Sequence, residues 1–185
     1  MKLMIASDIH GSAYYCEKLL SCYEKENADK LLLLGDLLYH GPRNDLPKDY
    51  DPKKVISMLN GISKELICVR GNCDTEVDQM VLEFPIMAEY AILYINNHMI
   101  FATHGHKYNP NQLPPMKPGD ILLNGHTHVS KCEKIGDYLY LNPGSVSIPK
   151  EDTPMGYIIL EDEKIIFKDI HGTDYMFFEM KDLIM

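Results

Sequence analysis

The chain has 185 residues, 45% of them hydrophobic, and its 27 acidic and 18 basic side chains give a formal net charge of −9. That length is sufficient for a stable core without disulfides, so a single soluble domain over residues 1–185 is expected. Stable nucleic-acid binding is excluded, because it depends on clustered Lys and Arg side chains and the sequence has no such cluster.

The cysteine pattern and the short apolar runs indicate the compartment. The five cysteines are odd in number and form no CxxC pair, which favours free thiols in a reducing environment. The first residues are typical of a short strand rather than of a signal peptide. No apolar run approaches the roughly 20 residues that cross a bilayer. The sequence therefore predicts a cytoplasmic protein without a membrane segment.

Short apolar runs in the first half of the chain predict buried strands. They cover residues 2–6, 31–34 and 66–69. The four consecutive leucines of the second run are typical of a strand that is buried on both faces.

Two helices are predicted between these strands. The first lies within residues 12–27, because Cys, Leu and Tyr recur there at helical spacing between a Ser start signal and an Asn stop signal. The second opens with Asp51 as N-cap and Pro52 at the first helical position, after a proline-containing loop. Gly61 stands where a left-handed residue is expected to end this helix.

The second half of the chain changes to a pattern of hairpins. Apolar runs at 91–95 and 99–103 flank two asparagines, which predicts a tight hairpin. A proline-rich loop at 110–118 follows. Each half is expected to supply one of two sheets packed face to face, with helices outside. The remaining strands are expected at 121–123, 138–141, 156–160 and 164–170, the last three antiparallel.

Five short motifs each follow directly on an apolar run. Ligands bind at the carboxyl ends of strands in open α/β sheets, so five such ends are expected to converge on one cleft. Five of the eight histidines lie in these motifs. The motifs are Asp8–His10, Gly35–Asp36, Gly71–Asp74, His104–His106 and Gly125–His128.

The side chains in these motifs agree chemically with one another. Carboxylates, one amide and imidazoles together suit divalent first-row metals, whereas oxygen ligands alone would suit Mg²⁺ or Ca²⁺. Seven candidate ligands are too many for one ion, but they suit two ions that share one carboxylate. The candidates are Asp8, His10, Asp36, Asn72, His104, His126 and His128.

This set of motifs resembles the calcineurin-type metallophosphoesterase family, from Asp8 to the turn at 142–145. Three longer segments are similar to the bacterial YfcE-type phosphodiesterases: HGPRN at 40–44, RGNCD at 70–74 and NPGSVSIPK at 142–150. The resemblance implies an α/β fold, a four-layer αββα sandwich of two mixed β-sheets flanked by helices. It also implies a metal-dependent phosphoric diester hydrolase with two metal ions in one site.

The resemblance divides the ligands between two divalent transition-metal ions. Mn²⁺ is the favoured ion, with Ni²⁺, Fe²⁺ and Zn²⁺ as alternatives. Two such ions clamp the reacting oxygens, and a hydroxide that bridges them would attack phosphorus in line. Asp36 would bridge the ions. One ion would be held by Asp8, His10, Asp36 and His128, and the other by Asp36, Asn72, His104 and His126.

The main departure from the family pattern is Cys73, because many members have histidine after the asparagine. A histidine there can stabilise the transition state or protonate the leaving oxygen, whereas a thiol is normally neutral and a weak donor. The loss should matter most for strongly basic leaving groups. We therefore expect activity on small-molecule phosphodiesters with good leaving groups, such as aryl diesters, and weaker phosphomonoesterase activity.

Further candidates lie beside the predicted ligands. Arg43 in the proline-containing loop is expected to bind phosphate through bidentate hydrogen bonds, and His106 lies two residues beyond a ligand. For both, and for His40, a role outside the reaction stays open. Asp74 is expected to orient the local backbone or His10 rather than to bind metal. The predicted catalytic group comprises Asn72, Cys73, His104, Arg43 and His106.

Two other functions stay open. A phosphomonoesterase or phosphoprotein phosphatase of the same fold is one, although its usual histidine is replaced here by Cys73. A protein-binding module resembling the small retromer subunit is the other, but that protein has lost ligands, whereas all seven positions are filled here. The apolar tail at 175–178 is expected to pack on its own core, with a homo-oligomer contact as the alternative.

Overall fold

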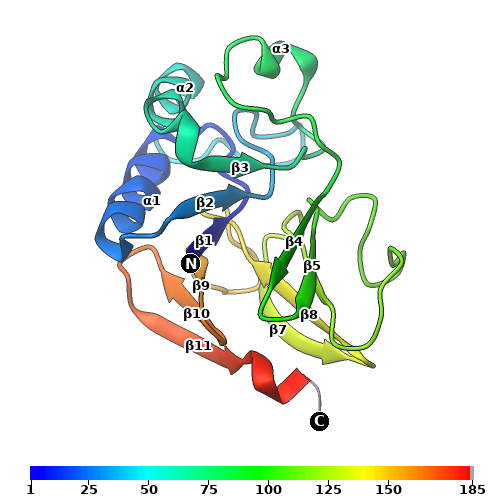
Figure 1. Cartoon of the computed structure of the whole chain (residues 1–185). Coiled ribbons are helices and arrows are strands. Elements are labelled where there is room, and N and C mark those ends of the chain that lie inside the picture. The colour runs from blue at the N-terminus through cyan, green and yellow to red at the C-terminus, as the bar shows by residue number, and fades with distance from the viewer. Residues whose placement is uncertain (184–185) are drawn as a thin grey trace.

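Two mixed β-sheets form the framework of the computed structural model, which describes residues 1–183 (Figure 1). The predicted domain spans 1–185, so its last two residues lie outside the described residues. The first sheet has the strand order β11-β10-β9-β1-β2-β3. Its strands are β1 (Lys2–Ala6), β2 (Lys30–Leu33), β3 (Leu66–Cys68), β9 (Gly156–Glu161), β10 (Lys164–Asp169) and β11 (Asp174–Glu179).

The second sheet has the order β4-β5-β6-β8-β7. Its strands are β4 (Ala91–Ile95), β5 (His98–Ala102), β6 (Ile121–Leu123), β7 (Ser130–Ile135) and β8 (Tyr138–Pro143). The predicted hairpin is confirmed, because β4 pairs antiparallel with β5 around Asn96 and Asn97, both in left-handed conformation. The predicted α/β class with two mixed sheets is likewise confirmed.

The expectation that each half of the chain supplies one sheet is wrong. The C-terminal strand β9 pairs antiparallel with the N-terminal strand β1, and β10 and β11 follow at that edge. Strand β1 is central in this sheet: β2 and β9 pair with its two edges, and Met4 and Ile5 are fully buried on its opposite faces. The chain therefore returns to the first sheet after completing the second.

The helices begin and end almost where the sequence predicts. Helix α1 (Ala13–Glu26) is capped by Ser12, whose hydroxyl accepts from the Tyr15 N–H at 3.3 Å, and ends at the left-handed residue Asn27. Helix α2 (Pro52–Gly61) begins at its predicted cap, Asp51. The left-handed role expected for Gly61 is wrong: its φ is not positive, and a 3₁₀ turn at Ser63–Glu65 carries the chain into β3.

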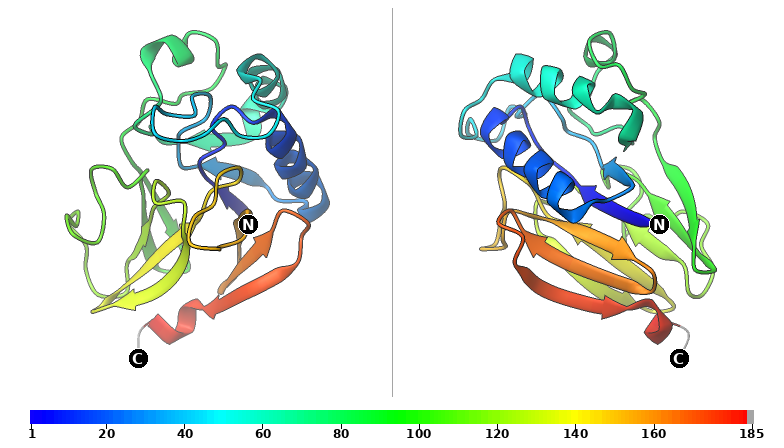
Figure 2. Two further views of the ribbon diagram at one scale, coloured as in Figure 1. Left: turned by 180° about the vertical axis from the view of Figure 1, so that it is seen from behind. Right: turned by 60° about the vertical axis from the view of Figure 1, so that its left-hand side comes forward.

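Three packed interfaces divide the molecule into layers. Helices α1 and α2 cover one face of the first sheet, burying Met4, Leu31 and Leu33 (Figure 2). The opposite face of that sheet packs on the second sheet, with Leu32 and Leu139 in the shared core. The outer face of the second sheet is packed by the loop at 105–118, which is the lime-green trace at the right of Figure 1.

Some elements were not predicted. The sequence pattern predicts neither strand β7 nor the short helix α3 (Glu76–Gln79), and it indicates only an apolar tail where β11 lies. The tail does pack on its own core through Tyr175, Met176 and Phe178, while Phe177 is 52% exposed. A final 3₁₀ turn occupies Met180–Leu183. Among the described residues, no helix is both long and apolar enough to span a membrane.

Truncation of Leu32 to alanine is expected to lower the free energy of unfolding by about 2–5 kcal/mol, because this fully buried side chain lies between the two sheets. Ile92 of β4, which is 46% exposed, provides a matched control, and Ile92→Ala should change stability by no more than about 0.5 kcal/mol. Urea unfolding monitored by circular dichroism measures both values. Equal losses in the two variants would contradict the assigned position of the core.

Candidate metal centre

The structure brings the seven predicted ligands together at one edge of the two sheets. Strands β1, β2 and β3 are parallel, as are β5 and β6, so the loops that follow these five strands meet at that edge. The side chains form three sets, and within each set the possible ligand atoms all lie within 4.8 Å of one another. The sets are Asp8, His10 and His128; Asp8, Asp36 and His104; and His10, Asp36 and Cys73.

Backbone carbonyl groups orient three of the imidazoles. Nδ1 of His10 donates to the Tyr39 carbonyl, and Nδ1 of His128 donates to the Ile148 carbonyl, both at 2.7 Å. Nδ1 of His104 donates to the Leu34 carbonyl, also at 2.7 Å. A carbonyl oxygen only accepts, so each Nδ1 carries a proton and each Nε2 is the atom free to bind a cation.

The Nε2 atoms point at one another and at carboxylate oxygens. Nε2 of His10 lies 3.1 Å from Nε2 of His128, and these atoms are 3.4 and 3.2 Å from Oδ1 of Asp8. That Oδ1 is buried and has no hydrogen-bond partner, although Oδ2 of Asp8 accepts from Ser7 Oγ and the His126 N–H. A cation at this position would satisfy both nitrogens and the unpartnered oxygen, so the donor set fits a metal ion.

Asp36 lies between the two halves of the cluster. Its Oδ2 is 3.8 Å from Nε2 of His10 and 3.4 Å from Nε2 of His104. Nε2 of His104 is in turn 3.0 Å from Oδ1 of Asn72 and 3.2 Å from Nδ1 of His126. A carboxylate with a histidine nitrogen on each side is the arrangement that two neighbouring ions sharing a ligand require.

The electrostatics of the cluster favour bound positive charge. Burial alone raises the pKa of Asp8, but the neighbouring imidazoles of His10 and His128 outweigh it and hold that pKa well below its usual value. Burial alone lowers the pKa of His104, but Asp36 and Asp8 raise it to about 9. The carboxylates therefore attract a proton to Nε2 of His104, and a metal ion competes for the same place.

Five of the proposed ligands adopt left-handed backbone conformations, which side chains other than glycine rarely do. Such residues persist only where the surrounding structure holds them, and they turn the chain sharply so that successive polar side chains face the same point. Their φ angles are 59° at Asp8, 51° at His10, 55° at Asp36, 66° at His126 and 63° at His128.

Two glycines allow the loops to approach closely. A Cβ atom on Gly71 would lie 2.1 Å from Oδ1 of Asp36, and one on Gly125 would lie 1.9 Å from Oγ of Ser7. Neither contact is tolerable, so any side chain at these positions would push the loops that carry Asp36 and Asp8 apart.

The segment 142–147 fixes the loops that carry Asp8 and His126. The hydroxyl of Ser145 donates to the Asp8 carbonyl at 2.8 Å, and Ser147 donates to the same oxygen at 3.1 Å. Nδ2 of Asn142 donates to the Gly125 carbonyl at 2.7 Å, in the loop that carries His126 and His128. These contacts explain why the segment has polar side chains although it is buried.

Asp74 supports the centre through the backbone, as predicted. Its carboxylate accepts from the N–H groups of Asp36 at 2.8 Å, Leu37 at 2.9 Å and Gly71 at 2.7 Å. Burial is the main reason why its pKa is raised, and the negative charge of Asp36 adds to the effect. Asp74 therefore holds the loops after β2 and β3 against each other.

Cys73 lies at the centre with its thiol in the neutral form. Its backbone N–H donates to Oδ1 of Asp36 at 2.8 Å, and its sulfur accepts from Nδ2 of Asn72 at 3.2 Å. Burial and, next, the Asp36 carboxylate raise the pKa of the thiol. A neutral thiol therefore occupies the place where many members of the family have histidine.

A cavity of about 440 Å³ opens onto the cluster. Arg43 lines it, as the sequence suggested, and so do Thr127 and Lys150, which the sequence analysis did not single out as functional. Lys150 is the last residue of the NPGSVSIPK segment, and nothing in the sequence spacing indicates that residues 43 and 150 line one cavity. Arg43 and Lys150 add positive charge where a phosphate would enter.

Neither His106 nor His40 lines the cavity that opens onto the cluster. The ring of His106 is 5.4 Å from that of His104, and it lines two neighbouring cavities but not the one that opens onto the cluster. Burial, and then the charges of His104 and His126, lower its pKa to about 4. His40 packs edge-on against Tyr39 and Tyr50 and does not line that cavity either.

The two-sheet α/β framework and the Asp/His cluster at its converging strand ends define a metal-binding phosphoesterase. The chain belongs to the calcineurin-like phosphoesterase superfamily, whose domain model matches residues 1–164. Divalent metal ions are therefore implied at the Asp/His cluster.

Several individual proteins are similar to the chain. It is 47% identical to phosphodiesterase YfcE of Escherichia coli over 163 residues, which cover 88% of this chain and 89% of that protein. It is 26% identical to phosphodiesterase MJ0936 of Methanocaldococcus jannaschii over 152 residues, covering 78% and 83%. The solved structure of the E. coli phosphoesterase Yfce superposes with a TM-score of 0.94, covering 97% of this chain and all of that one, at 42% identity.

A more distant structure shares the fold alone. Vps29 of Entamoeba histolytica, solved in complex with Zn²⁺, superposes with a TM-score of 0.64 at 21% identity, covering 97% of this chain and 99% of that one.

The Asp74→Asn variant is expected to lower the free energy of unfolding by about 1–3 kcal/mol. Both carboxylate oxygens accept hydrogen bonds from buried backbone N–H groups, and the NH₂ group of an asparagine cannot accept them. Thermal and urea unfolding of metal-free protein measure the loss. Asp78→Asn, in the exposed cap of α3, is the control, and its effect should be smaller. Wild-type stability of Asp74→Asn would contradict the role given to this carboxylate.

Proposed function

We propose that the chain is a phosphodiesterase that uses two divalent metal ions, and that Asp36 holds both. The observation that carries the proposal is the position of the Asp36 carboxylate between Nε2 of His10 and Nε2 of His104, with further ligand atoms on each side. The name of the E. coli relative, phosphodiesterase YfcE, supports the choice of reaction.

The geometry supports a specific division of ligands. The first ion would be held by the group around the unpartnered oxygen of Asp8, and the second by the group around His104. When bound, two such ions neutralise phosphoryl oxygens and lower the pKa of a coordinated water. The first group is Asp8, His10, Asp36 and His128, and the second is Asp36, Asn72, His104 and His126.

The chain's own residues bind and orient the substrate. Arg43 and Lys150 line the cavity over the cluster, so we propose that they bind the non-bridging oxygens of the phosphate. Asn72 is solvent-exposed and makes contacts with both His104 and Cys73, which places its amide at the junction of cluster and cavity. We propose no direct catalytic step for His106, because it does not line this cavity.

Cys73 supports the preference for good leaving groups. The thiol is neutral, its pKa is raised by burial and by the Asp36 carboxylate, and it already accepts a hydrogen bond from Asn72. It is therefore a poor donor to a leaving oxygen. A phenolate departs without protonation more easily than an alkoxide, so aryl diesters are the expected substrates.

The identity of the ions and the location of the enzyme are also proposals. The mixture of carboxylate, amide and imidazole ligands supports Mn²⁺, with Ni²⁺, Fe²⁺ or Zn²⁺ as alternatives. The five free cysteines support a cytoplasmic location. Small-molecule substrates are supported by the size of the cavity and the net charge of −9, which disfavours a nucleic-acid polymer.

A protein-binding module is the alternative of a different class. The likeness to Vps29 proteins concerns the fold, whereas the alternative would require a centre unable to turn over phosphoesters. The buried, unpartnered Oδ1 of Asp8 and the convergent Nε2 atoms favour catalysis. Phosphomonoesterase activity is the alternative within the same class of enzyme.

Metal-reconstituted protein is expected to hydrolyse bis(4-nitrophenyl) phosphate with Mn²⁺ and to prefer it over 4-nitrophenyl phosphate. Asp36→Asn should lower kcat/KM about 100-fold or more. Mutation of residues that only hydrogen-bond to metal ligands already lowers metal affinity or activity about 10–100-fold. The control is Asp162→Asn in the exposed β9–β10 turn, which should retain full activity. Preference for the monoester, or full activity of Asp36→Asn, would overturn the proposal.

Cys73→His is expected to flatten the dependence of log kcat on leaving-group pKa across a series of aryl and alkyl diesters. An imidazole at this position can protonate a basic leaving oxygen, which the neutral thiol cannot do well. Cys73→Ser, which introduces no titratable ring, should keep the steep dependence of the wild type. Metal content measured by atomic absorption should be the same in all three proteins. An unchanged slope in Cys73→His would refute the role assigned to this position.

A further inference from the structure

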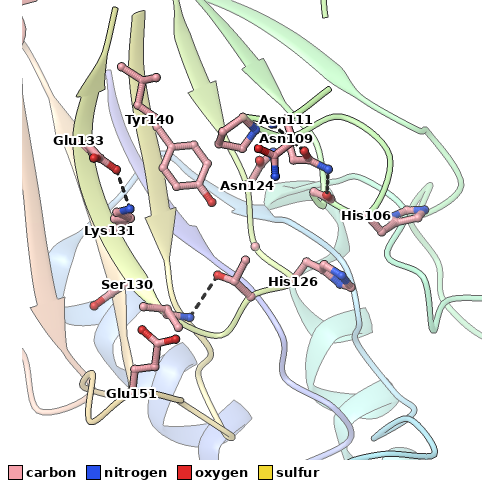
Figure 3. A pocket seen from close by; sticks show the side chains of 16 residues that line it. His106, Asn109, Asn111, Asn124, His126, Ser130, Lys131, Glu133, Tyr140 and Glu151 are labelled. Atoms are coloured by element: carbon pink, nitrogen blue, oxygen red, sulfur yellow. Dashed lines mark hydrogen bonds and ion pairs between the residues drawn. The ribbon is translucent and has the colours of Figure 1, made fainter. Parts of the chain in front are cut away.

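A second and larger cavity adjoins the one over the metal cluster. Its volume is about 610 Å³, and it lies between the 105–111 segment and the outer face of β7 and β8 (Figure 3). Both cavities are lined by His126 and Thr127, so they meet at the proposed second metal position. We call the larger one the loop cavity. A group bound there would be within reach of a phosphate at the centre.

The loop cavity exists because a loop rather than a helix covers the second sheet. The loop is held by its own hydrogen bonds: Oδ1 of Asn109 accepts from the N–H of Asn111 at 2.9 Å and of Gln112 at 3.2 Å. Nδ2 of Asn109 donates to the Gly105 carbonyl at 3.1 Å, which ties the loop to the segment after His104. The cavity is therefore largely preformed, as small-molecule sites usually are.

The lining combines apolar surface with polar groups that can form further hydrogen bonds. Figure 3 shows Tyr140 in the wall of the cavity, with Asn109, Asn111 and Asn124 on one side. Asn124 is 1% exposed, and its Nδ2 donates to the Thr103 and Leu123 carbonyls, while its Oδ1 is buried without a partner. A buried acceptor without a partner is unfavourable unless a water or a ligand donates to it.

The charges of the two cavities differ in sign. The loop cavity contains Lys131, paired with Glu133 at 2.6 Å, and also Glu151, so carboxylates outnumber ammonium groups. The cavity over the cluster is instead lined by two cationic side chains, Arg43 and Lys150, and one carboxylate, Asp36. A phosphate is attracted to the cluster, whereas a second anionic group would be repelled from the loop cavity.

We propose that the loop cavity binds one ester group of the diester, and that this group is an uncharged nucleoside. Its volume falls in the range of about 300–1,000 Å³ that is typical of small-molecule sites. A nucleoside offers a flat ring for Tyr140 and Ile135, together with N–H and hydroxyl donors for the amide and carboxylate acceptors. The assignment rests on the proposed function, because it takes the cluster as the site of the phosphate.

Two diesters that share one leaving group test the proposal. With Mn²⁺-loaded enzyme, KM for thymidine 5′-(4-nitrophenyl phosphate) should be about tenfold lower than KM for methyl 4-nitrophenyl phosphate, which corresponds to about 1.4 kcal/mol of binding. The value of kcat reports whether the nucleoside binds in the productive orientation. Equal KM values would contradict the proposal, and so would a lower KM for the methyl diester.

Variants at Asn111 show whether the loop cavity is responsible. This exposed residue lines the cavity, so Asn111→Trp should fill the space and remove the KM difference, whereas Asn111→Ser should keep it. Glu17→Ala, on the exposed face of α1, is the control for expression and metal loading. A KM difference that persists in Asn111→Trp would place nucleoside binding elsewhere and overturn the assignment.

A measurement without metal separates this proposal from the proposed function. In EDTA, saturation-transfer NMR should detect thymidine bound to the wild type and to Asn111→Ser, but not to Asn111→Trp, and thymidine 3′,5′-bisphosphate should bind less. Absence of transfer to thymidine would refute the loop-cavity assignment even if both diesters are hydrolysed. Transfer together with no hydrolysis of either diester would refute the phosphodiesterase and retain the nucleoside site.

Discussion

Buried carboxylates that need a positive partner are the constraint on which the rest of the structure depends. Asp8 and Asp36 are 0% and 2% exposed, and each shows histidine nitrogens rather than lysine or arginine around its inward oxygen. Uncompensated charges are expensive inside a protein, so this arrangement is stable only with a proton or a metal ion between the groups. The pKa of His104 is raised because Asp36 and Asp8 favour its protonated form.

The scaffold supplies the rigidity that such a cluster requires. Left-handed residues in the ligand loops are strained, and they are held by contacts from elsewhere: Asp74 binds three backbone N–H groups, and Ser145 and Ser147 share the Asp8 carbonyl. Behind them, β1 is paired on both sides and buried on both faces. The polar centre is therefore fixed by an apolar core to which both ends of the chain contribute.

The sequence indicated which polar side chains gather in one cluster, because apolar strands and polar loops alternate so clearly in the chain. It placed Asp8, Asp36 and His104 at strand ends, where the structure has them. It missed β7, whose exposed Lys131 and Glu133 give no apolar signal, and the pairing of β9 with β1, which depends on contacts more than 150 residues apart. It also did not find Lys150 or the loop cavity, because both depend on how distant segments meet.

We propose that two metal ions share the Asp36 carboxylate. The most direct test is titration of metal-free protein with Mn²⁺, followed by equilibrium dialysis and low-temperature electron paramagnetic resonance. We expect two Mn²⁺ per chain with a spin-coupled signal, because two ions that share a carboxylate lie about 3.5–4 Å apart. A stoichiometry of one, or two ions with only uncoupled signals, would contradict the shared centre.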